Sequence, residues 1–404
     1  MWQVLLFLSF FVWLLSLFVD NHKSPPSTTT TSNSSPNMNL GRRFLPVNPI
    51  SKIVPKSPSK RLVDEKFTLM TYNMLSPHYM WPQVYSYVSE EYKDWKFRHN
   101  LLQKEILDVY RADIMCLQEL TSYDYHQYWE RTIARDFHYG SKFIAKTPPQ
   151  YWTKKPNDMD GVGIFYNLNK FDFLSSSGIY LNDLLGTFDL DEIKYLQNKI
   201  VHLTDGAGKS IGEKSLMEVL KSRNQVGLFV SLKHKDTGTI FVVVNTHLYW
   251  KYDEVKITQC MVIMRKLSKI IKNLLIGEQG ITYNKMKVVF AGDLNSTRDS
   301  LVIKFLRGER FNLGKLDIVN PMRPYLNRCL YDEIPDDYYV HTCYSGKLKG
   351  IFDYIWYHDS DFSLTKVLTG SDVSKELSES KQFGLPNENH PSDHIPVLAE
   401  FVIL

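Results

Sequence analysis

The sequence contains the stretch Val288-Val289-Phe290-Ala291-Gly292-Asp293-Leu294-Asn295, in which a run typical of a β-strand is followed by two polar residues. An apolar run of strand-like composition ends at Gly292. In an extended segment residues two apart share a face, so Asp293 and Asn295 are expected to point at the same place. The stretch therefore predicts a buried β-strand that delivers a carboxylate and an amide to its carboxyl end.

A second polar cluster, His390-Pro391-Ser392-Asp393-His394, lies near the C-terminus, and an apolar run over residues 395–401 follows it. His394 is thus expected at the mouth of another strand. A carboxylate and an amide that face an imidazole can hold a metal-bound phosphate and the water that attacks it. A lone acid or histidine at a strand end is usually a turn or surface residue, so this hypothesis needs support from elsewhere in the chain.

Four further apolar runs end in the same way. They are residues 67–72 before Asn73, 112–118 before Glu119, 240–244 before His247, and 350–352 before Asp353. Open sheets bind their ligands at strand ends. The repeated pattern therefore predicts one site at the edge of a sheet.

Six motifs, in this order and spacing, carry a resemblance to a known family. They are YNML at 72–75, CLQEL at 116–120, NTHLYW at 245–250, GDLNST at 292–297, FDYIWY at 352–357 and HPSDHIP at 390–396. The set resembles the endonuclease/exonuclease/phosphatase superfamily. More narrowly, it is similar to the branch that holds nocturnin, the Angel proteins, the carbon-catabolite-repression deadenylases and the fungal Ngl RNA exonucleases. Residues 79–85 and 245–252 look most similar to the Ngl group.

The resemblance implies an α/β fold, a four-layer sandwich of two packed mixed β-sheets flanked by helices, with its catalytic domain over residues 65–404. It implies a Mg²⁺-dependent hydrolase, with Mn²⁺ as an alternative cation. The expected reaction is that of a 3′→5′ RNA exonuclease, a phosphodiesterase that releases 5′-nucleotides and is deadenylase-like. Residues 254–275 show helical apolar spacing and predict an amphipathic helix packed on the core.

The resemblance also assigns metal ligands. Glu119 resembles the main metal ligand, and Asn73 lies beside it in the family pattern. Asp393 resembles a second ligand or an orienting residue. Hard oxygen donors of this kind are what Mg²⁺ takes, usually with several waters retained.

Five further residues match catalytic positions of the family. Asp293 matches the residue that orients or deprotonates the attacking water, and Asn295 the one that holds a phosphate oxygen. His394 matches the residue that donates to a non-bridging oxygen, with Asp353 as the carboxylate that fixes its tautomer. His247 occupies the second catalytic histidine position and is expected to stabilise the same oxygens.

The chain departs from the poly(A)-specific members where they stack adenine. Leu348 stands where those members carry an aromatic residue, and the loop after the NTH motif is shorter here. Stacking on an aromatic contributes roughly 1–3 kcal/mol per base, so a weaker preference for adenine is predicted. Trp250, Tyr252 and Phe352 are candidates to stack a base instead, and core packing is the alternative for each.

Composition fits a single folded enzyme. The chain has 404 residues and a formal net charge of +4, so no basic tail identifies a nucleic-acid partner. Its cysteines are scattered, at Cys116, Cys260, Cys329 and Cys343. Because they form no CxxC or Cys/His pattern, neither a zinc site nor a disulfide framework is predicted. This cysteine usage predicts a reducing compartment.

The N-terminal residues are expected to form two segments outside the enzyme. Residues 1–20 are a hydrophobic anchor or targeting segment, whose apolar stretch at 2–19 is at the lower limit for spanning a bilayer. It lacks a basic start and a small-residue cleavage site, which disfavours a removable signal peptide. Residues 21–64 are a disordered basic linker rich in Ser, Thr and Pro. Basic residues after the apolar stretch place the enzyme on a cytosol-facing membrane, the mitochondrial outer membrane or the endoplasmic reticulum.

An alternative start changes this localisation. Met38 opens a segment that carries Arg42, Arg43, Lys52 and Lys56 and no acid before Asp64. This segment resembles a mitochondrial presequence, although its prolines oppose a helix. On this interpretation residues 1–37 are absent from the main product, and the enzyme lies in the mitochondrial interior.

Two other functions remain open from the sequence. A phosphatase or phosphodiesterase on a small molecule, such as a dinucleotide 2′-phosphate or a phospholipid headgroup, would use the same metal site. A catalytically silent adaptor is disfavoured because every motif keeps its polar residue. The RNA substrate requires a basic groove that leads away from Glu119, whereas a small ligand requires a closed pocket.

Overall fold

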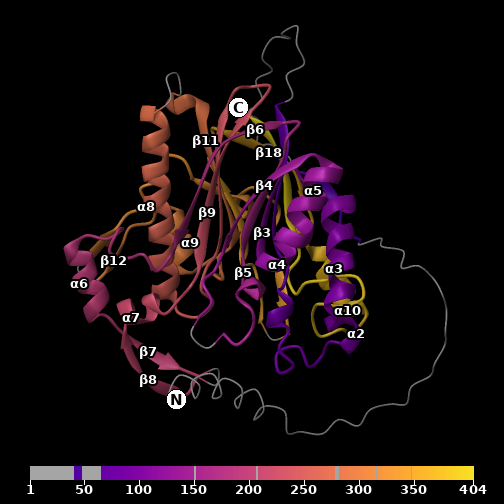
Figure 1. The fold of residues 1–404 in the computed structure, drawn as a ribbon, viewed down its shortest axis with the longest axis horizontal. Helices are drawn as coiled ribbons and strands as arrows, with labels where there is room; N and C mark the ends of the chain where they lie inside the picture. Colours follow the sequence, from indigo (N-terminus) through magenta and orange to yellow (C-terminus); the bar gives the residue numbers. More distant parts are fainter. Residues whose placement is uncertain are drawn as a thin grey trace, which may run out of the picture.

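Two β-sheets packed face to face form the centre of the molecule, and helices cover both outer sides (Figure 1). The computed structural model describes residues 41–47, 65–149, 152–205, 208–277, 282–314, 316–346 and 348–404. The predicted four-layer α/β sandwich is confirmed.

The first sheet has seven strands. In spatial order they are β1 (Phe44–Pro46), β18 (Phe362–Leu368), β19 (Val397–Ile403), β2 (Lys66–Asn73), β3 (Ile114–Thr121), β5 (Asp160–Asn167) and β4 (Tyr139–Ala145). The β2–β3 pair is parallel, and the remaining neighbours are antiparallel. The sheet is therefore mixed.

The second sheet has six strands. In spatial order they are β14 (Arg328–Cys329), β17 (Asp353–Tyr357), β11 (Met286–Asp293), β10 (Ile240–His247), β9 (Val226–His234) and β6 (Phe171–Tyr180). Here β10 and β11 are the parallel pair. Both sheets thus carry one parallel pair near their middle.

Three small hairpins accompany the two sheets. They are β7 (Ile200–Thr204) with β8 (Ser210–Ser215), β12 (Phe311–Leu313) with β13 (Leu316–Ile318), and β15 (Cys343–Ser345) with β16 (Leu348–Gly350). An isolated bridge joins Cys343 to His394. The β15–β16 hairpin therefore lies next to one of the predicted catalytic residues.

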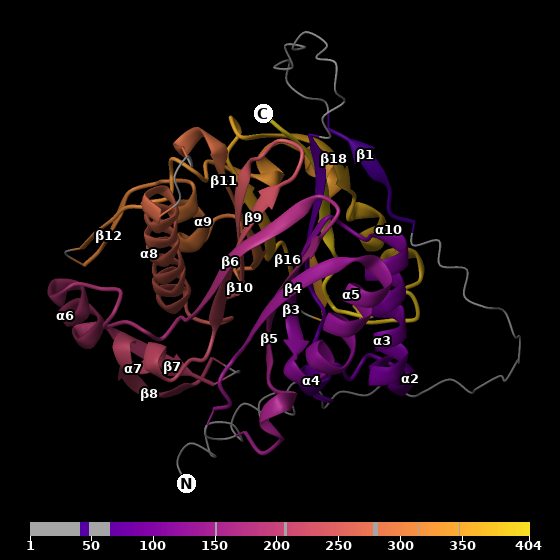
Figure 2. The same ribbon diagram turned by 45° about the horizontal axis from the view of Figure 1, so that its top comes forward.

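Helices cover the outer faces of the two sheets (Figures 1 and 2). The first sheet is covered by α2 (Glu90–Lys93), α3 (Trp95–Gln103), α4 (Ser122–Asp124), α5 (Glu130–Phe137) and α10 (Ser371–Glu379). On the other side lie α6 (Leu190–Asn198), α7 (Leu216–Lys221), α8 (Asp253–Gly277) and α9 (Leu301–Leu306). The helix predicted over residues 254–275 is confirmed as α8.

Alternating side chains of β2 separate two hydrophobic cores. Phe67 and Leu69 belong to the core that fills the space between the sheets. Met70 and Tyr72 point the other way and pack beneath the outer helices. Because successive side chains of an extended strand point to opposite faces, β2 contributes residues to both cores.

Part of the predicted linker is ordered. Residues 41–47 lie within the segment 21–64 that was expected to be disordered, yet β1 pairs with β18. The Arg42 guanidinium donates to the carbonyls of Thr369 at 2.6 Å and Pro396 at 2.7 Å. The disorder prediction is wrong for these residues, because edge pairing and a bonded arginine offset the entropy of ordering them.

The predicted anchor at residues 2–19 lies outside the described residues, as do residues 48–64 of the linker. Within the described ranges no helix is long and apolar enough to cross a membrane. The membrane anchor and the localisation stay predictions.

Phe67 should be a stability determinant. Its ring contacts Phe241, Phe362 and Phe401 at centroid distances of 5.0, 5.3 and 5.5 Å and is 1% exposed. Phe67→Ala should lower the free energy of unfolding by about 3–5 kcal/mol, because it leaves a cavity between the sheets. Urea unfolding would measure the loss. Phe173→Ala, at a ring that is 40% exposed, is the control and should lose far less; equal losses would contradict the packing argument.

Candidate active site

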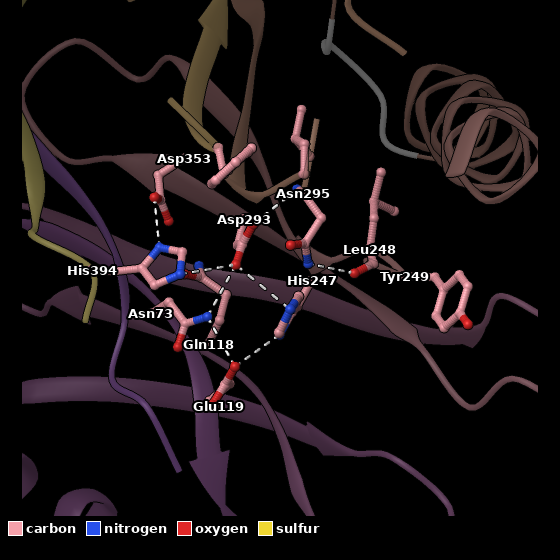
Figure 3. A network of polar contacts seen from close by, with 12 residues as sticks. Asn73, Gln118, Glu119, His247, Leu248, Tyr249, Asp293, Asn295, Asp353 and His394 are labelled. Carbon is pink, nitrogen blue, oxygen red and sulfur yellow. Dashed lines mark hydrogen bonds and ion pairs between the residues drawn. The ribbon is translucent and has the colours of Figure 1, made fainter. Parts of the chain in front are cut away.

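The parallel strand pairs bring the predicted residues to one edge of the sandwich. Asn73 ends β2, whose parallel neighbour β3 carries Glu119. In the second sheet His247 ends β10 and lies beside Asp293, the last residue of β11. Asp353, the first residue of β17, pairs with Asp293 from the other side. Figure 3 shows these side chains pointing toward one another.

A β-bulge aims Glu119 into the site. The β3–β5 register shifts between Gln118 and Leu120, and Glu119 has a φ of 56°. Gln118 points between the sheets, where its amide donates to Asn245 Oδ1 at 2.8 Å. In an unbroken strand the next side chain would point to the opposite face. The bulge and the left-handed backbone at Glu119 turn the carboxylate back toward the second sheet.

The Asn73 amide connects the two carboxylates. Its Nδ2 donates to Glu119 Oε1 and to Asp293 Oδ2, both at 3.0 Å, while Oδ1 accepts from the Leu75 backbone N–H at 3.0 Å. The Ser76 N–H donates to Glu119 Oε2 at 2.9 Å. The amide thus holds carboxylates from both sheets. For Asn73 to offer an oxygen to a metal beside Glu119, its amide would have to reverse.

The segment from Asp293 to Asn295 is a turn, which corrects the reasoning from an extended strand. Strand β11 ends at Asp293, Asn295 has a φ of 47°, and its N–H donates to Asp293 Oδ1 at 2.8 Å. The Asn295 side-chain amide donates to the Leu248 carbonyl at 2.9 Å. Asp293 and Asn295 are neighbours in the site because an Asx turn folds one onto the other, not because they alternate along a strand.

His394 is held by an acid at one nitrogen and faces another acid with the second. Its Nδ1 is 2.8 Å from Asp353 Oδ2, and its Nε2 is 3.7 Å from Asp293 Oδ2. Burial alone would lower the pKa of His394, but Asp353, Cys343 and Asp293 raise that pKa well above its usual range. His394 is therefore an imidazolium that donates to Asp353 and presents its other N–H to the site.

His247 is the neutral counterpart. Its Nε2 lies 3.5 Å from Asp293 Oδ2 and its Nδ1 lies 3.9 Å from Glu119 Oε1. Burial, and then the nearby cations of Lys146 and His394, lower the pKa of His247 well below its ordinary value. Its buried Nδ1 has no hydrogen-bond partner among the described residues. The two histidines thus differ in charge because only His394 has a close carboxylate partner.

The site carries more buried negative charge than its cations balance. Burial, with Asp160 and Asp393 nearby, raises the pKa of Glu119 to about 7. Burial also raises the pKa of Asp293 to about 6, although His394 opposes the shift. Buried carboxylates with raised pKa values suit a divalent cation, which would favour their ionised form.

Candidate metal ligands fall into two compact groups and a separate carboxylate. Among the described residues, ligand atoms of Cys343, Asp393 and His394 lie within 4.8 Å of one another, as do those of Asp293, Asp353 and His394. Glu119 belongs to neither group. Asp393 Oδ2 accepts from the Tyr85 hydroxyl at 2.9 Å. Asp393 is thus oriented by Tyr85 beside His394.

Four supporting residues were missed by the sequence reasoning. Lys146 Nζ lies 2.6 Å from Asp160 Oδ2, and both side chains are buried. Arg98, also fully buried, donates to the carbonyls of Leu75 and Pro391. Arg98 therefore ties the loop after Asn73 to the loop before His394. Charged residues are rarely fully buried, and only the folded chain reveals that Lys146, Asp160, Arg98 and the hydroxyl of Tyr85 converge here.

The four predicted base-binding residues do not share one environment. Trp250 and Leu348 are 50% and 53% exposed. The hydroxyl of Tyr252 accepts from the Thr204 N–H at 3.0 Å, and its ring packs on the core. Phe352 is only 6% exposed. The ring of Phe352 packs over Gly350, as the core-packing alternative expects. A stacking role for these residues stays a prediction.

Comparisons with known proteins identify the family of the chain. A model of the Endonuclease/Exonuclease/phosphatase family matches residues 70–394. The RNA exonuclease NGL1 of Saccharomyces cerevisiae is 66% identical over 369 residues, which cover 90% of this chain and 99% of that protein. The CCR4-Not complex 3′-5′-exoribonuclease subunit Ccr4 of Candida albicans is 28% identical over 87% of this chain, and the match spans 42% of that protein.

Solved structures share the fold. The crystal structure of ANGEL2, a 2′,3′-cyclic phosphatase, superposes with a TM-score of 0.61 at 20% identity, covering 90% of this chain and 98% of the other. The human Nocturnin catalytic domain superposes with a TM-score of 0.55 at 18% identity and the same coverage. At these identities the likeness concerns the architecture.

Glu119→Gln should make the metal-free protein more stable at high pH. Folding raises the pKa of the Glu119 carboxyl from 4.5 to about 7. Its contribution to the free energy of unfolding is therefore fully present below pH 4.5, the pKa in the unfolded chain, and is lost as the pH rises through about 7. The neutral amide avoids the loss, so the variant should gain about 1–3 kcal/mol at pH ~8 and little at pH ~4. Thermal unfolding with a chelator would measure this. A variant that is less stable at both pH values would contradict the charge argument.

Proposed function

The chain belongs to the endonuclease/exonuclease/phosphatase family, and we propose that it is a metal-dependent RNA exonuclease that removes nucleotides from the 3′ end. The 66% identity to the yeast RNA exonuclease NGL1, over 99% of that protein, carries the proposal. The convergence of Glu119, Asp293 and His394 at one edge supports it, because hydrolysis of a phosphodiester needs an acid, a base and charge stabilisation in one place.

Asp293 is the proposed base. Its Oδ2 faces the imidazoles of both histidines and accepts from the Asn73 amide. In the ionised form it takes the proton of a water whose oxygen attacks the phosphorus, while the bond from phosphorus to the 3′ oxygen breaks and that oxygen takes a proton from solvent. A pKa of about 6 for Asp293 leaves it mostly ionised near neutral pH yet basic enough to accept a proton.

His394 is the proposed donor to the phosphate. Its Nδ1–H is committed to Asp353, so the free Nε2–H points toward Asp293 and the space where a phosphate would lie. A charged donor held in place before the reaction stabilises charge on a non-bridging oxygen without reorganisation. Neutral His247 completes the cluster from β10 and can donate one N–H to the same oxygens.

Mg²⁺ is the proposed cation, with Mn²⁺ as its substitute. Glu119 would be its main ligand, supported by Asn73, and Asp393, beside His394, would act as a second ligand or an orienting residue. When bound, the cation would polarise the scissile phosphate and neutralise its developing charge. Its hard-oxygen preference fits the carboxylate and amide donors of this site.

A gel assay on labelled RNA tests the activity. The full chain, supplied with Mg²⁺ and 5′-labelled oligo(A) and oligo(U), should yield ladders that shorten from the 3′ end. Glu119→Gln should lose at least about 10²-fold in rate, because the main metal ligand is gone. Intact RNA with the wild-type protein would overturn the exonuclease assignment and favour a small phosphorylated substrate.

We propose only a weak preference for poly(A) over other RNA. Leu348, on β16, is exposed at the position expected to stack adenine and offers no aromatic face. We therefore propose a modest ratio of oligo(A) to oligo(U) rates in the same assay. We also propose attachment to a cytosol-facing membrane through residues 2–19, or import into the mitochondrion if translation starts at Met38, as the sequence suggests.

Asp353→Asn should impair the donor. Without the carboxylate, the pKa of His394 falls, because Asp353 is the strongest of the groups that raise it. The rate constant kcat should drop by roughly 10²–10⁴-fold, and activity should be lost at a lower pH than in the wild type. A pH profile of kcat measures both effects. Asp136→Asn, at an exposed acid bound to Arg135, is the control; an unchanged profile for Asp353→Asn would contradict the assigned role.

A further inference from the structure

Four arginines line one pocket beside the catalytic edge. Arg298, Arg307, Arg323 and Arg328 surround a volume of about 510 Å³, which we call the arginine pocket. Its wall is formed by the loop after β11, by α9 and by the segment around β14. None of these residues belongs to the catalytic cluster.

The arginine pocket adjoins the active site through two connections. Arg298 lies on the same loop as Asn295, shortly after the end of β11. Tyr331, which also lines the pocket, donates its hydroxyl to the backbone carbonyl of Asp353 at 2.8 Å. The loop and the tyrosine therefore place the pocket next to the residues that hold His394.

The acids of the pocket neutralise its arginines incompletely. Asp332 pairs closely with Arg307, at 2.9 Å. Asp336 is 3.8 Å from Arg298, and the two side chains are 96% and 43% exposed, so solvent screens that pair. Arg323 has its contact with a neutral group, the carbonyl of Asn327 at 2.8 Å. Arg328 lies 3.1 Å from Asp359. The surplus of positive charge in the pocket thus rests on Arg323 and, more weakly, on the exposed Arg298.

Backbone geometry holds Arg323 in position. Gly308, which follows α9, has a φ of 79°, and a Cβ there would lie 2.7 Å from Arg323 Cδ. The absence of a side chain at Gly308 therefore lets the arginine stem lie across the turn. A guanidinium with free N–H groups in a fixed fork suits the oxygens of a phosphate.

A second pocket, of about 570 Å³, has fewer uncommitted cations. It is lined by Arg265, Lys266 and Lys269 among others. Arg265 binds both carboxylate oxygens of Glu192, and Lys269 donates to the Gly186 carbonyl. Its cations are thus largely used within the fold, and the arginine pocket is the better candidate for an external anion.

We propose that the arginine pocket binds backbone phosphates of the RNA strand upstream of the nucleotide being removed. The inference rests on the proposed exonuclease function and adds a second contact site for the same substrate. An RNA whose 3′ end lies at Asp293 must run outward over the surface with one negative charge per nucleotide. Contacts between these backbone phosphates and the arginines of the neighbouring pocket would raise the affinity for RNA without recognising its bases.

The double variant Arg298→Gln/Arg323→Gln tests the proposal in the full chain. With an RNA of about twelve nucleotides, the KM should rise about tenfold, because charge-assisted hydrogen bonds to phosphate are lost. The salt dependence of KM should flatten by about 0.7 in log–log slope for each phosphate released. KM and kcat for a dinucleotide, which has no upstream phosphates, should stay close to those of the wild type.

Two controls separate binding from folding. Arg135→Gln removes a comparable exposed arginine from α5, on the opposite side of the sandwich, and should leave KM and the salt slope unchanged. Thermal unfolding of the double variant should match that of the wild type, because Arg298 has only a solvent-screened pair with Asp336 at 3.8 Å and Arg323 contacts a neutral carbonyl. A tenfold rise in KM with unchanged stability supports the proposal.

Other outcomes would overturn it. An active wild type whose KM and salt slope match those of the double variant would show that RNA does not use the pocket. RNA binding in the pocket is also contradicted if inorganic phosphate stabilises the wild type but not the variant while their RNA affinities stay equal. If the wild type cleaves no RNA, the exonuclease proposal fails by itself. Fluorescence anisotropy with labelled RNA then still tests whether the arginine pair contributes to binding, and equal affinities would reject the pocket.

Discussion

The Asn73 side-chain amide is the interaction on which the site depends. It donates to Glu119 within its own sheet and to Asp293 across the interface, both at 3.0 Å. One small side chain thereby fixes the distance between carboxylates that two separate sheets supply. The sheets themselves are held by the apolar core between them, and the amide joins them at the edge where chemistry is proposed to occur.

The same edge concentrates charge that the fold alone does not balance. Burial raises the pKa of Glu119 to about 7 and that of Asp293 to about 6. His394 is bonded to Asp353 at 2.8 Å and becomes cationic, whereas His247 has no carboxylate nearer than 3.5 Å, and burial keeps it neutral. The site therefore stores electrostatic free energy that a divalent cation would release on binding, a common trade of stability for function.

Sequence reasoning located the strands more reliably than it located the side chains. Apolar runs of fixed period predicted β2, β3, β10 and β11 and the long helix α8, because burial against a sheet imposes that period on the chain. It failed where backbone turns or distant partners decide orientation. Asn295 reaches Asp293 through an Asx turn rather than by alternation along a strand.

By itself, the sequence determined the order of the motifs and the set of polar residues at the strand ends, because these depend on local periodicity and on residue type. The two-sheet class followed from the resemblance of those motifs to a known family. Only the tertiary structure decided which of them meet. The bulge at Glu119, the buried Lys146–Asp160 pair and the arginine pocket all join segments far apart in the chain. Such contacts depend on strand register and layer packing, which no local pattern of residues encodes.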